Sequence, residues 1–222
     1  MRVLGIDTSS FALGISLIED ERIIFDLLIN SGIPRSEDII EIMSQWINNP
    51  AEIDGFGIAL GPGSFTGLRV GIATVKGFAL GFKKPVAGIP TLDAFVQGII
   101  SQGVPYAKYR ITPIMDAKMD EVYTASYEND GRRLTSYLSI KPAELLDKLG
   151  DHIFVGNGVK IYSNLIKEKL GNRAHFISPN PDSPRGSWVA ALALKRLKEG
   201  DSDNIDSLEP IYLHPPRIKH KT

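Results

Sequence analysis

The order of the predicted strands and helices is the feature that most constrains the fold of this chain. In the first half, short apolar runs and amphipathic segments follow the order β-β-β-α-β-α-β-α. Capping residues and turn residues bound these segments, as Ser36 and Pro50 do around the first helix. The expected strands cover residues 3–6, 13–18, 23–29, 56–60 and 86–88, and the expected helices cover residues 36–47, 66–81 and 91–101.

The second half of the chain repeats this order with different letters. Asp7 and Asp116 each end the first strand of their half, just before the first hairpin. The recurrence therefore rests on the order of elements and on this shared detail rather than on sequence identity. The expected strands cover residues 111–115, 122–127, 133–140, 153–155 and 175–177, and the expected helices cover residues 142–149, 159–170 and 187–199.

A unit of this order used twice predicts an α/β protein with the duplicated ribonuclease-H-like, actin-like fold. In that fold two lobes, each β-β-β-α-β-α-β-α, face each other across a cleft. We predict an N-terminal lobe over residues 1–102, a C-terminal lobe over residues 103–200 and a tail over residues 201–222. The alternative is a two-layer α/β domain without internal duplication.

Composition excludes several classes of function. The chain has no cysteine, which rules out disulfides, thiolate metal sites and cysteine nucleophiles. Its four histidines lack the spacing of helical metal ligands, and no G-x-S-x-G motif is present, so we assign neither a metal site nor catalytic residues. The formal net charge is −1, which gives no overall attraction to nucleic acid. The opening segment is a strand rather than a signal peptide, and no apolar run reaches a membrane span, so we expect a cytoplasmic protein.

The end of the first strand and the loop at Gly61 are candidates for contact with an anion or a nucleotide. Hydroxyl and backbone N–H groups gather there, and a helix begins just after the loop. The loop lacks the Lys–Ser/Thr pair of a P-loop. The alternatives are that Asp7 only forms a turn and that Ser64 or Thr66 only caps the helix. The candidate residues are Asp7, Thr8, Ser9, Gly61, Gly63 and Ser64.

The helix expected over residues 66–81 contains glycines whose presence needs a reason. A glycine in a helix interior costs about 0.8–1 kcal/mol relative to alanine, so another contact must offset that cost. Four large or branched apolar side chains share one stripe that suits a sheet, and the glycines and Thr74 lie on a different side. We expect the helix over residues 36–47 alongside this smooth side and a second chain over both helices. The glycines are Gly67, Gly71, Gly77 and Gly81.

Several stretches of the chain resemble the TsaB (YeaZ) family. The opening VLGIDTSSFALGISL, the block IALGPGSFTGLRVGIATVKGFALG with IPTLDAF after it, and MDAKMDEVYTASY carry the resemblance. GNGVKIY and the terminal PIYLHP are similar to later stretches of the family, so the resemblance covers nearly the whole chain. The block GPGSFTGLRVG is highly specific, whereas the Asp-Thr-Ser start is shared with related actin-like proteins. The family pattern departs at Arg35, where many members have His, and at His214, where they have Arg.

The resemblance implies a non-catalytic partner in N6-threonylcarbamoyladenosine formation. Such a protein pairs with a TsaD homologue through its two N-lobe helices, acts with the ATPase TsaE, meets tRNA indirectly and forms a homodimer when alone. No intrinsic cofactor is implied beyond weak or interface-shared ATP or ADP. The partner-binding residues would be Asp38, Glu41, Ile42, Gly67, Arg69, Val70, Gly71, Ala73, Thr74, Lys76 and Gly77.

Two further functions compete with that reading. An independent actin-like phosphotransferase or ATPase would use Asp7 and the loop over residues 61–66. A peptidase function, the older label for this group, is not supported because the sequence lacks the spacing of metal ligands.

The tail contains Pro215 and Pro216, which exclude a regular helix, and it is basic. It is either a terminus that is strapped down or frayed, or an RNA contact.

Overall fold

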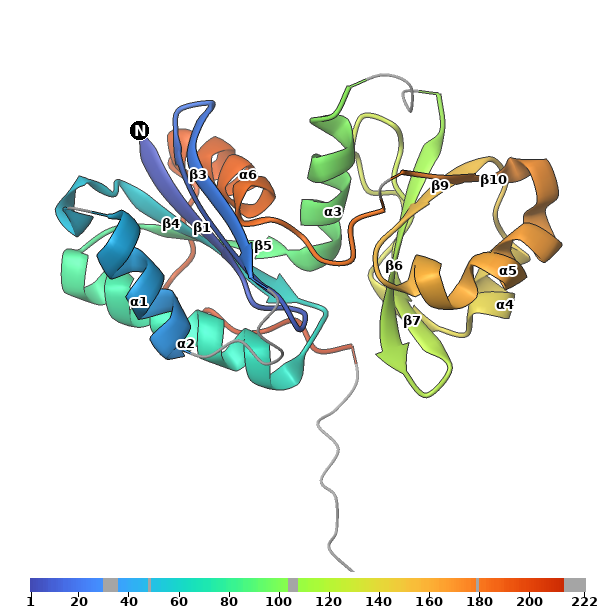
Figure 1. Ribbon diagram of the computed structural model, residues 1–222, viewed down its shortest axis with the longest axis horizontal. Helices are drawn as coiled ribbons and strands as arrows, with labels where there is room; N and C mark the ends of the chain where they lie inside the picture. Colours follow the sequence, from blue (N-terminus) through green and yellow to red (C-terminus); the bar gives the residue numbers. More distant parts are fainter. Residues whose placement is uncertain (30–35, 48, 104–107, 179, 214–222) are drawn as a thin grey trace, which may run out of the picture.

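The computed structural model contains two five-stranded sheets in two lobes (Figure 1). It describes residues 1–29, 36–47, 49–103, 108–178 and 180–213. The first sheet has the order β3-β2-β1-β4-β5 and the second the order β10-β9-β6-β7-β8. The first sheet comprises β1 (Arg2–Asp7), β2 (Leu13–Glu19), β3 (Arg22–Ile29), β4 (Gly55–Gly61) and β5 (Val86–Pro90). The second comprises β6 (Arg110–Lys118), β7 (Glu121–Thr124), β8 (Leu138–Ile140), β9 (His152–Val155) and β10 (Ala174–Phe176).

The helices connect these strands in the order that the sequence predicts for both halves. In the first half β1 pairs antiparallel with β2 and parallel with β4, and in the second half β6 pairs antiparallel with β7 and parallel with β9. The duplicated β-β-β-α-β-α-β-α order is therefore confirmed. The helices are α1 (Ser36–Trp46), α2 (Phe65–Phe82), α3 (Thr91–Ile100), α4 (Pro142–Leu146), α5 (Gly158–Leu170) and α6 (Gly186–Lys198).

The boundaries differ most in the second lobe. The strand expected over residues 122–127 ends at Thr124, because Tyr127 instead forms isolated bridges with Ile111 and Arg133. The following strand is short for the same reason and covers only Leu138–Ile140. Hydrophobic periodicity alone does not show where backbone pairing stops.

The first sheet is covered on both faces. On one face α1 and α2 lie side by side and bury Ile39 and Ile72 with strand residues such as Ile6. On the other face α6 approaches so closely that strand glycines are needed. A Cβ on Gly5 or Gly57 would lie less than 3.0 Å from α6 atoms, a separation that real Cβ atoms essentially never show. The sheet thus carries helices on both sides, as a mixed α/β layer requires.

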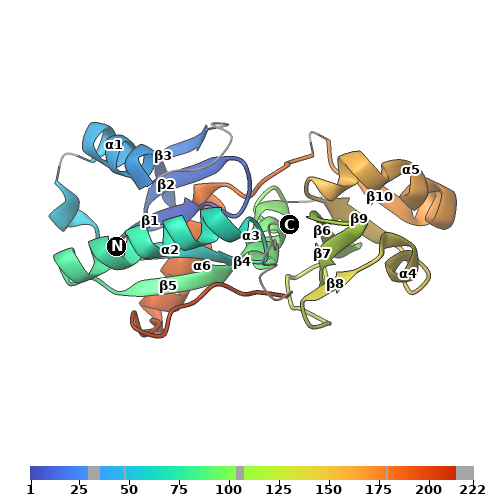
Figure 2. The same ribbon diagram turned by 90° about the horizontal axis from the view of Figure 1, so that it is seen from below.

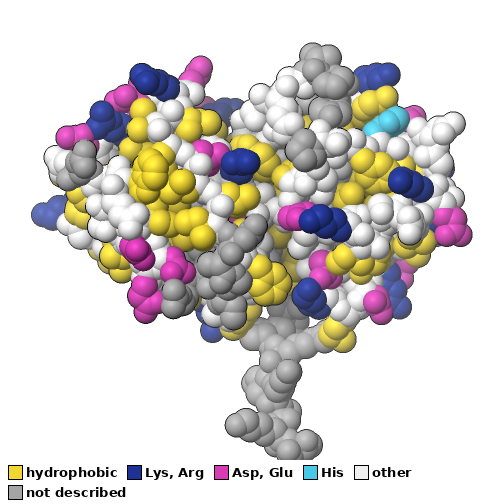
Figure 3. Space-filling model, viewed as in Figure 1, with side chains coloured by type: hydrophobic (Ala, Val, Ile, Leu, Met, Phe, Trp, Pro, Cys, Tyr) yellow, Lys and Arg dark blue, Asp and Glu magenta, His cyan; other side chains and the backbone are white. Residues whose placement is uncertain are grey.

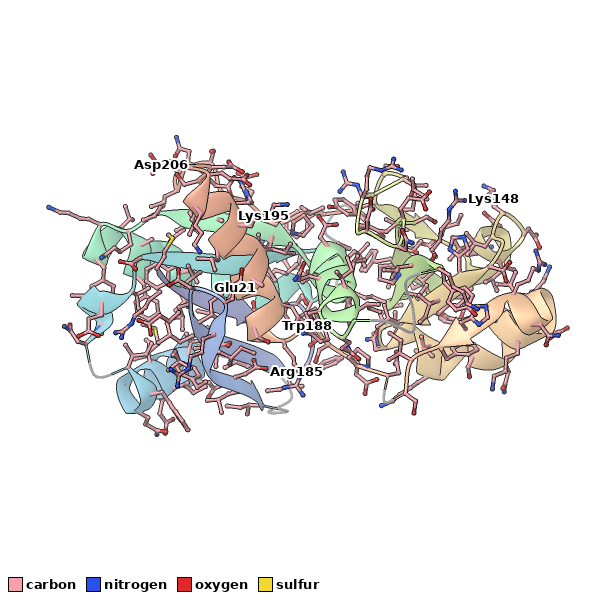
Figure 4. All side chains as sticks on the ribbon, turned by 90° about the horizontal axis from the view of Figure 1, so that it is seen from above. Glu21, Lys148, Arg185, Trp188, Lys195 and Asp206 are labelled. Carbon is pink, nitrogen blue, oxygen red and sulfur yellow. The ribbon has the colours of Figure 1, made fainter. Side chains whose placement is uncertain are left out.

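The last helix of each half packs against the other lobe. α3 belongs by sequence to residues 1–102, yet Leu92 and Phe95 pack in one cluster with Ile111 and Ile153 of the second sheet. α6 lies within residues 103–200, yet its contacts are with the first sheet. Trp188 on α6 packs against Phe95 of α3 with ring centroids 6.3 Å apart, at the junction seen in Figure 4. Spatial lobes and sequence halves therefore do not coincide at these two helices.

Candidate functional site

A buried polar cluster lies where β1 ends. Asp7, Thr8 and Ser9 are at most 2% exposed. The Ser9 backbone N–H donates to Asp7 Oδ1 at 3.3 Å. Burial raises the pKa of Asp7 from 3.8 to about 7, because a charged carboxylate is poorly solvated there. Among the described residues, Asp7 Oδ2, Thr8 Oγ1 and Ser9 Oγ have no hydrogen-bond partner.

The loop at Gly61 and the first turns of α2 close over this cluster. The Ser64 backbone N–H donates to the Ser9 carbonyl at 2.6 Å. A Cβ on Gly63 would run into the Ser9 backbone, one on Gly67 into the Thr8 carbonyl, and one on Gly71 into Thr8 Oγ1, all at less than 3.0 Å. These three glycines are therefore required by the close approach of the chain to itself.

The N-terminus of α2 is capped within the chain. Ser64 Oγ accepts a hydrogen bond from the Gly67 N–H at 3.3 Å, so the cap considered from the sequence is present. Of the six residues expected near an anion, Ser9, Gly63 and Ser64 lie together, and Asp7 and Thr8 lie directly beneath them. Gly61 faces Leu68 and the Ile211 carbonyl instead. Contact of this site with an anion or a nucleotide stays a prediction.

The second strand-end carboxylate has a local role. Asp116 Oδ1 accepts from the Lys118 N–H at 3.0 Å, and Oδ2 pairs with Lys118 Nζ at 2.5 Å. Lys118, Met119 and Asp120 all have positive φ in the hairpin that follows. Asp116 thus stabilises a tight hairpin, as an Asx turn does. No group of three potential ligands that could hold a metal ion occurs among the described residues.

The outer face of α1 and α2 is the second candidate site. Ala73 and Gly77 are exposed on α2, Leu80 is 61% exposed, and a Cβ on Gly77 would meet nothing within 4 Å. On α1, Ile40 and Trp46 are each 52% exposed. Figure 3 shows hydrophobic side chains gathered on the first lobe in this view. The exposed face of α2 is therefore smooth, and apolar side chains are exposed on both helices.

The residues expected to bind a partner fall into two groups. Gly67, Gly71 and Ile42 are buried inside the first lobe, so the expectation that they line a contact surface is wrong. The glycines were misassigned because a helix sequence does not show which neighbour its small residues approach. Of the others, Glu41, Arg69, Ala73 and Gly77 are exposed, and Asp38, Val70, Thr74 and Lys76 are half-buried.

The described part of the tail is strapped down on the first lobe, which is one of the alternatives that the sequence left open. The Ile211 N–H donates to the Leu60 carbonyl at 2.7 Å, and Leu208 is buried in the first lobe. Asp203 accepts from the Gly88 N–H at 2.6 Å and pairs with Arg196 of α6. The available signal was the alternation of acidic and apolar residues after Gly200. The basic end of the tail, residues 214–222, lies outside the described residues.

The fold and this site define a class of protein: two actin-like lobes with a strand-end polar cluster closed by the protein's own glycine loop. Residues 37–219 match the family model described as TsaD, tRNA N6-adenosine threonylcarbamoyltransferase. Curated relatives that match nearly end to end are TsaB proteins. The chain belongs to this threonylcarbamoyltransferase family, within its TsaB (YeaZ) branch.

The relatives and solved structures agree on length and fold. The tRNA threonylcarbamoyladenosine biosynthesis proteins TsaB of Bacillus subtilis and Escherichia coli are 25% and 27% identical, over 96% of this chain and 94% of each relative. YeaZ from Pseudomonas aeruginosa superposes with a TM-score of 0.77 at 24% identity, covering 96% of this chain and 99% of that chain. The ethanolamine utilization protein EutJ from Carboxydothermus hydrogenoformans, at 11% identity over 86% and 89% of the chains, gives 0.52.

Part of the chain also matches a transferase. The tRNA N6-adenosine threonylcarbamoyltransferase of Fervidobacterium nodosum is 33% identical over 108 residues, which is 40% of this chain and 32% of that protein. None of the described helices is long and apolar enough to cross a membrane.

Proposed function

We propose that this chain is a non-catalytic subunit for N6-threonylcarbamoyladenosine formation in tRNA, and that it pairs with a TsaD-like transferase through α1 and α2. The observation that carries the pairing is the exposed face of α2, where Ala73, Gly77 and Leu80 lie with open space above Gly77. A helix that packs only on its own sheet is expected to show a polar outer face. The outer face of α2 carries small side chains instead, so a helix of another chain can approach it closely.

The absence of catalysis is supported by the state of the strand-end site. In this chain Gly63, Gly67 and Gly71 bring the loop and α2 directly onto Thr8 and Ser9. Within the described residues, no cluster of potential ligands could hold a metal ion there.

The other members of the assembly remain part of the proposal. The ATPase TsaE would act with the pair, tRNA would be reached chiefly through the transferase, and weak ATP or ADP binding would be shared at an interface. A homodimer would use the same α1–α2 face and would compete with the heterodimer. Cytoplasmic location fits this role.

The proposal is tested by reconstitution with the TsaD and TsaE proteins of the same organism. Omitting this chain should abolish modification of unmodified tRNA. Gly77→Leu should weaken pairing with the transferase at least tenfold, about 1.4 kcal/mol, because the added side chain holds the helices apart. The substitution should not unfold the chain, since Leu is a better helix former than Gly by about 0.8 kcal/mol.

Gly150→Leu provides the matched control. Gly150 is also exposed, and a Cβ there would meet nothing within 4 Å, but it lies in the second lobe. This variant should pair and support modification like the wild type. Undiminished pairing of the Gly77→Leu protein would refute the α2 face as the interface, and modification without this chain would refute the subunit role.

A further inference from the structure

Phe65 and Arg69 of α2 form an exposed cluster with Tyr212 of the tail. The Arg69 guanidinium carbon lies 3.9 Å from the centre of the Phe65 ring and 5.8 Å from that of Tyr212. Arg69 Nε donates to the Tyr212 hydroxyl at 2.9 Å. The two ring centroids are 5.2 Å apart. The arginine is thus held against two aromatic rings.

The docked tail fixes Tyr212 in this position. The Ile211 N–H is bonded to the Leu60 carbonyl at 2.7 Å, one residue before the tyrosine. Further back, Leu208 is buried and Lys76 Nζ donates to the Asp206 carbonyl at 3.4 Å. The cluster is therefore assembled by two segments that lie far apart in the sequence and are tied together along their length.

The cluster leaves binding groups open to solvent. Phe65 is 37% exposed and Tyr212 is 39% exposed. Among the described residues the guanidinium of Arg69 is hydrogen-bonded only through Nε, so its two Nη groups are available. An arginine whose plane is already fixed loses less entropy when it binds a phosphate or stacks on a base. Half-exposed aromatic rings offer faces on which unpaired bases stack.

The sequence that follows Tyr212 is basic. After Glu209 the sequence contains no acidic residue, but it contains Arg217, Lys219 and Lys221. A second cation–aromatic pair, Lys118 over Phe11 at 5.9 Å, joins the second lobe to the loop after β1. Because the whole chain has a net charge of −1, this basic segment is a local feature. Figure 2 shows the described part of the tail passing along the first lobe toward the second.

We propose that Phe65, Arg69 and Tyr212 bind an unpaired segment of the tRNA substrate, by stacking bases on the rings and by a bidentate contact from Arg69 to a phosphate. Exposed aromatic rings beside arginine are the chemistry by which proteins hold single-stranded RNA. A protein partner can instead use the exposed face around Gly77, whereas the Arg69 guanidinium lies against Phe65 and the tail residue Tyr212. The inference rests on the proposed function, because that function supplies the RNA.

The test measures RNA binding by the full-length chain with an unmodified tRNA and its anticodon stem-loop, by fluorescence anisotropy at two salt concentrations. Arg69→Ala should weaken binding about tenfold. Arg69→Lys keeps the charge but not the planar fork and should remain several-fold weaker than the wild type. Phe65→Leu, which keeps an apolar side chain, should also weaken binding, and a fully paired RNA duplex should bind less well than the stem-loop. Arg132→Ala, at an exposed site in the second lobe, should have no effect.

The outcomes separate this inference from the proposed function. Equal RNA affinity of the Arg69→Ala and wild-type chains, or no binding by the wild type, overturns the inference while reconstituted modification can still succeed. If Arg69→Ala leaves RNA binding unchanged and weakens pairing with the transferase, the cluster belongs to the protein interface and the inference is also overturned. Failure of the wild-type chain to support modification would instead count against the proposed function.

Discussion

Replacement of Asp7 by Asn should make the chain more stable near neutral pH. Asp7 is fully buried, and burial raises its pKa from 3.8 to about 7. The folded protein therefore holds a proton that the unfolded chain has already lost between these pH values. Folding stability falls as pH rises through this window, because the folded state must either keep the proton or bury the charge.

The size of the effect follows from the shift. The difference between 3.8 and about 7 is roughly 3 pH units, and each unit corresponds to about 1.4 kcal/mol. Asp7→Asn should therefore gain up to about 4 kcal/mol over the wild type between pH 4 and pH 8. Asn keeps an oxygen that can accept from the Ser9 N–H, so the backbone bond at this position need not be lost.

Urea unfolding followed by tryptophan fluorescence measures this gain at several pH values. The quantity to follow is the difference in unfolding free energy between variant and wild type, because other titrating groups cancel in it. Asp130→Asn, which replaces an exposed carboxylate, is the matched control for loss of one negative charge. If the difference in unfolding free energy between Asp7→Asn and the wild type stays constant from pH 4 to pH 8, burial does not raise the pKa of Asp7 and the argument is refuted.

Three further predictions concern packing and buried polar groups. Gly71→Ala should lose about 1–3 kcal/mol of stability because its Cβ meets Thr8, whereas Gly77→Ala should gain up to about 1 kcal/mol. Urea unfolding measures both changes, and equal effects would contradict the conclusion that Gly71 faces Thr8 and Gly77 faces open space. His152 should titrate near pH 4 by NMR, because burial lowers its pKa from 6.5 to about 4. Its contribution to folding stability should therefore rise as pH increases from 4 to 6.5, and a titration midpoint near 6.5 would show that the ring is solvated. Asp93→Ala should cost about 2–4 kcal/mol by thermal unfolding, since two tyrosine hydroxyls lose their acceptor, and a neutral outcome would mean that water replaces it.

The core of the duplication could be predicted because it depends on local patterns. Alternating and continuous apolar runs, and a cap such as Ser64 before α2, are properties of neighbouring residues. The repeated order of elements then limits the topology strongly. Strand ends in the second lobe were less predictable, because Tyr127 continues the apolar pattern after regular pairing has stopped.

The roles of the glycines in α2 could not be separated from sequence. The cost of a glycine within a helix is visible in the letters, and so is the conclusion that a close contact must offset it. The contact itself is a matter of position: Gly71 faces Thr8 of the same chain, and Gly77 faces open space. The surface offered to a partner is therefore narrower than the glycine pattern indicates.

The sequence by itself determined the two-fold order of strands and helices, the family resemblance and the lack of cysteine and of metal-ligand spacing, since all of these are carried by residue identity and short spacing. Only the tertiary structure decided that α3 and α6 pack across the lobes, that the glycine loop closes over Asp7, and that Tyr212 meets Arg69. Arg69 and Tyr212, for example, lie 143 positions apart. The formation of these contacts depends on how whole layers pack, which no local pattern of residues encodes.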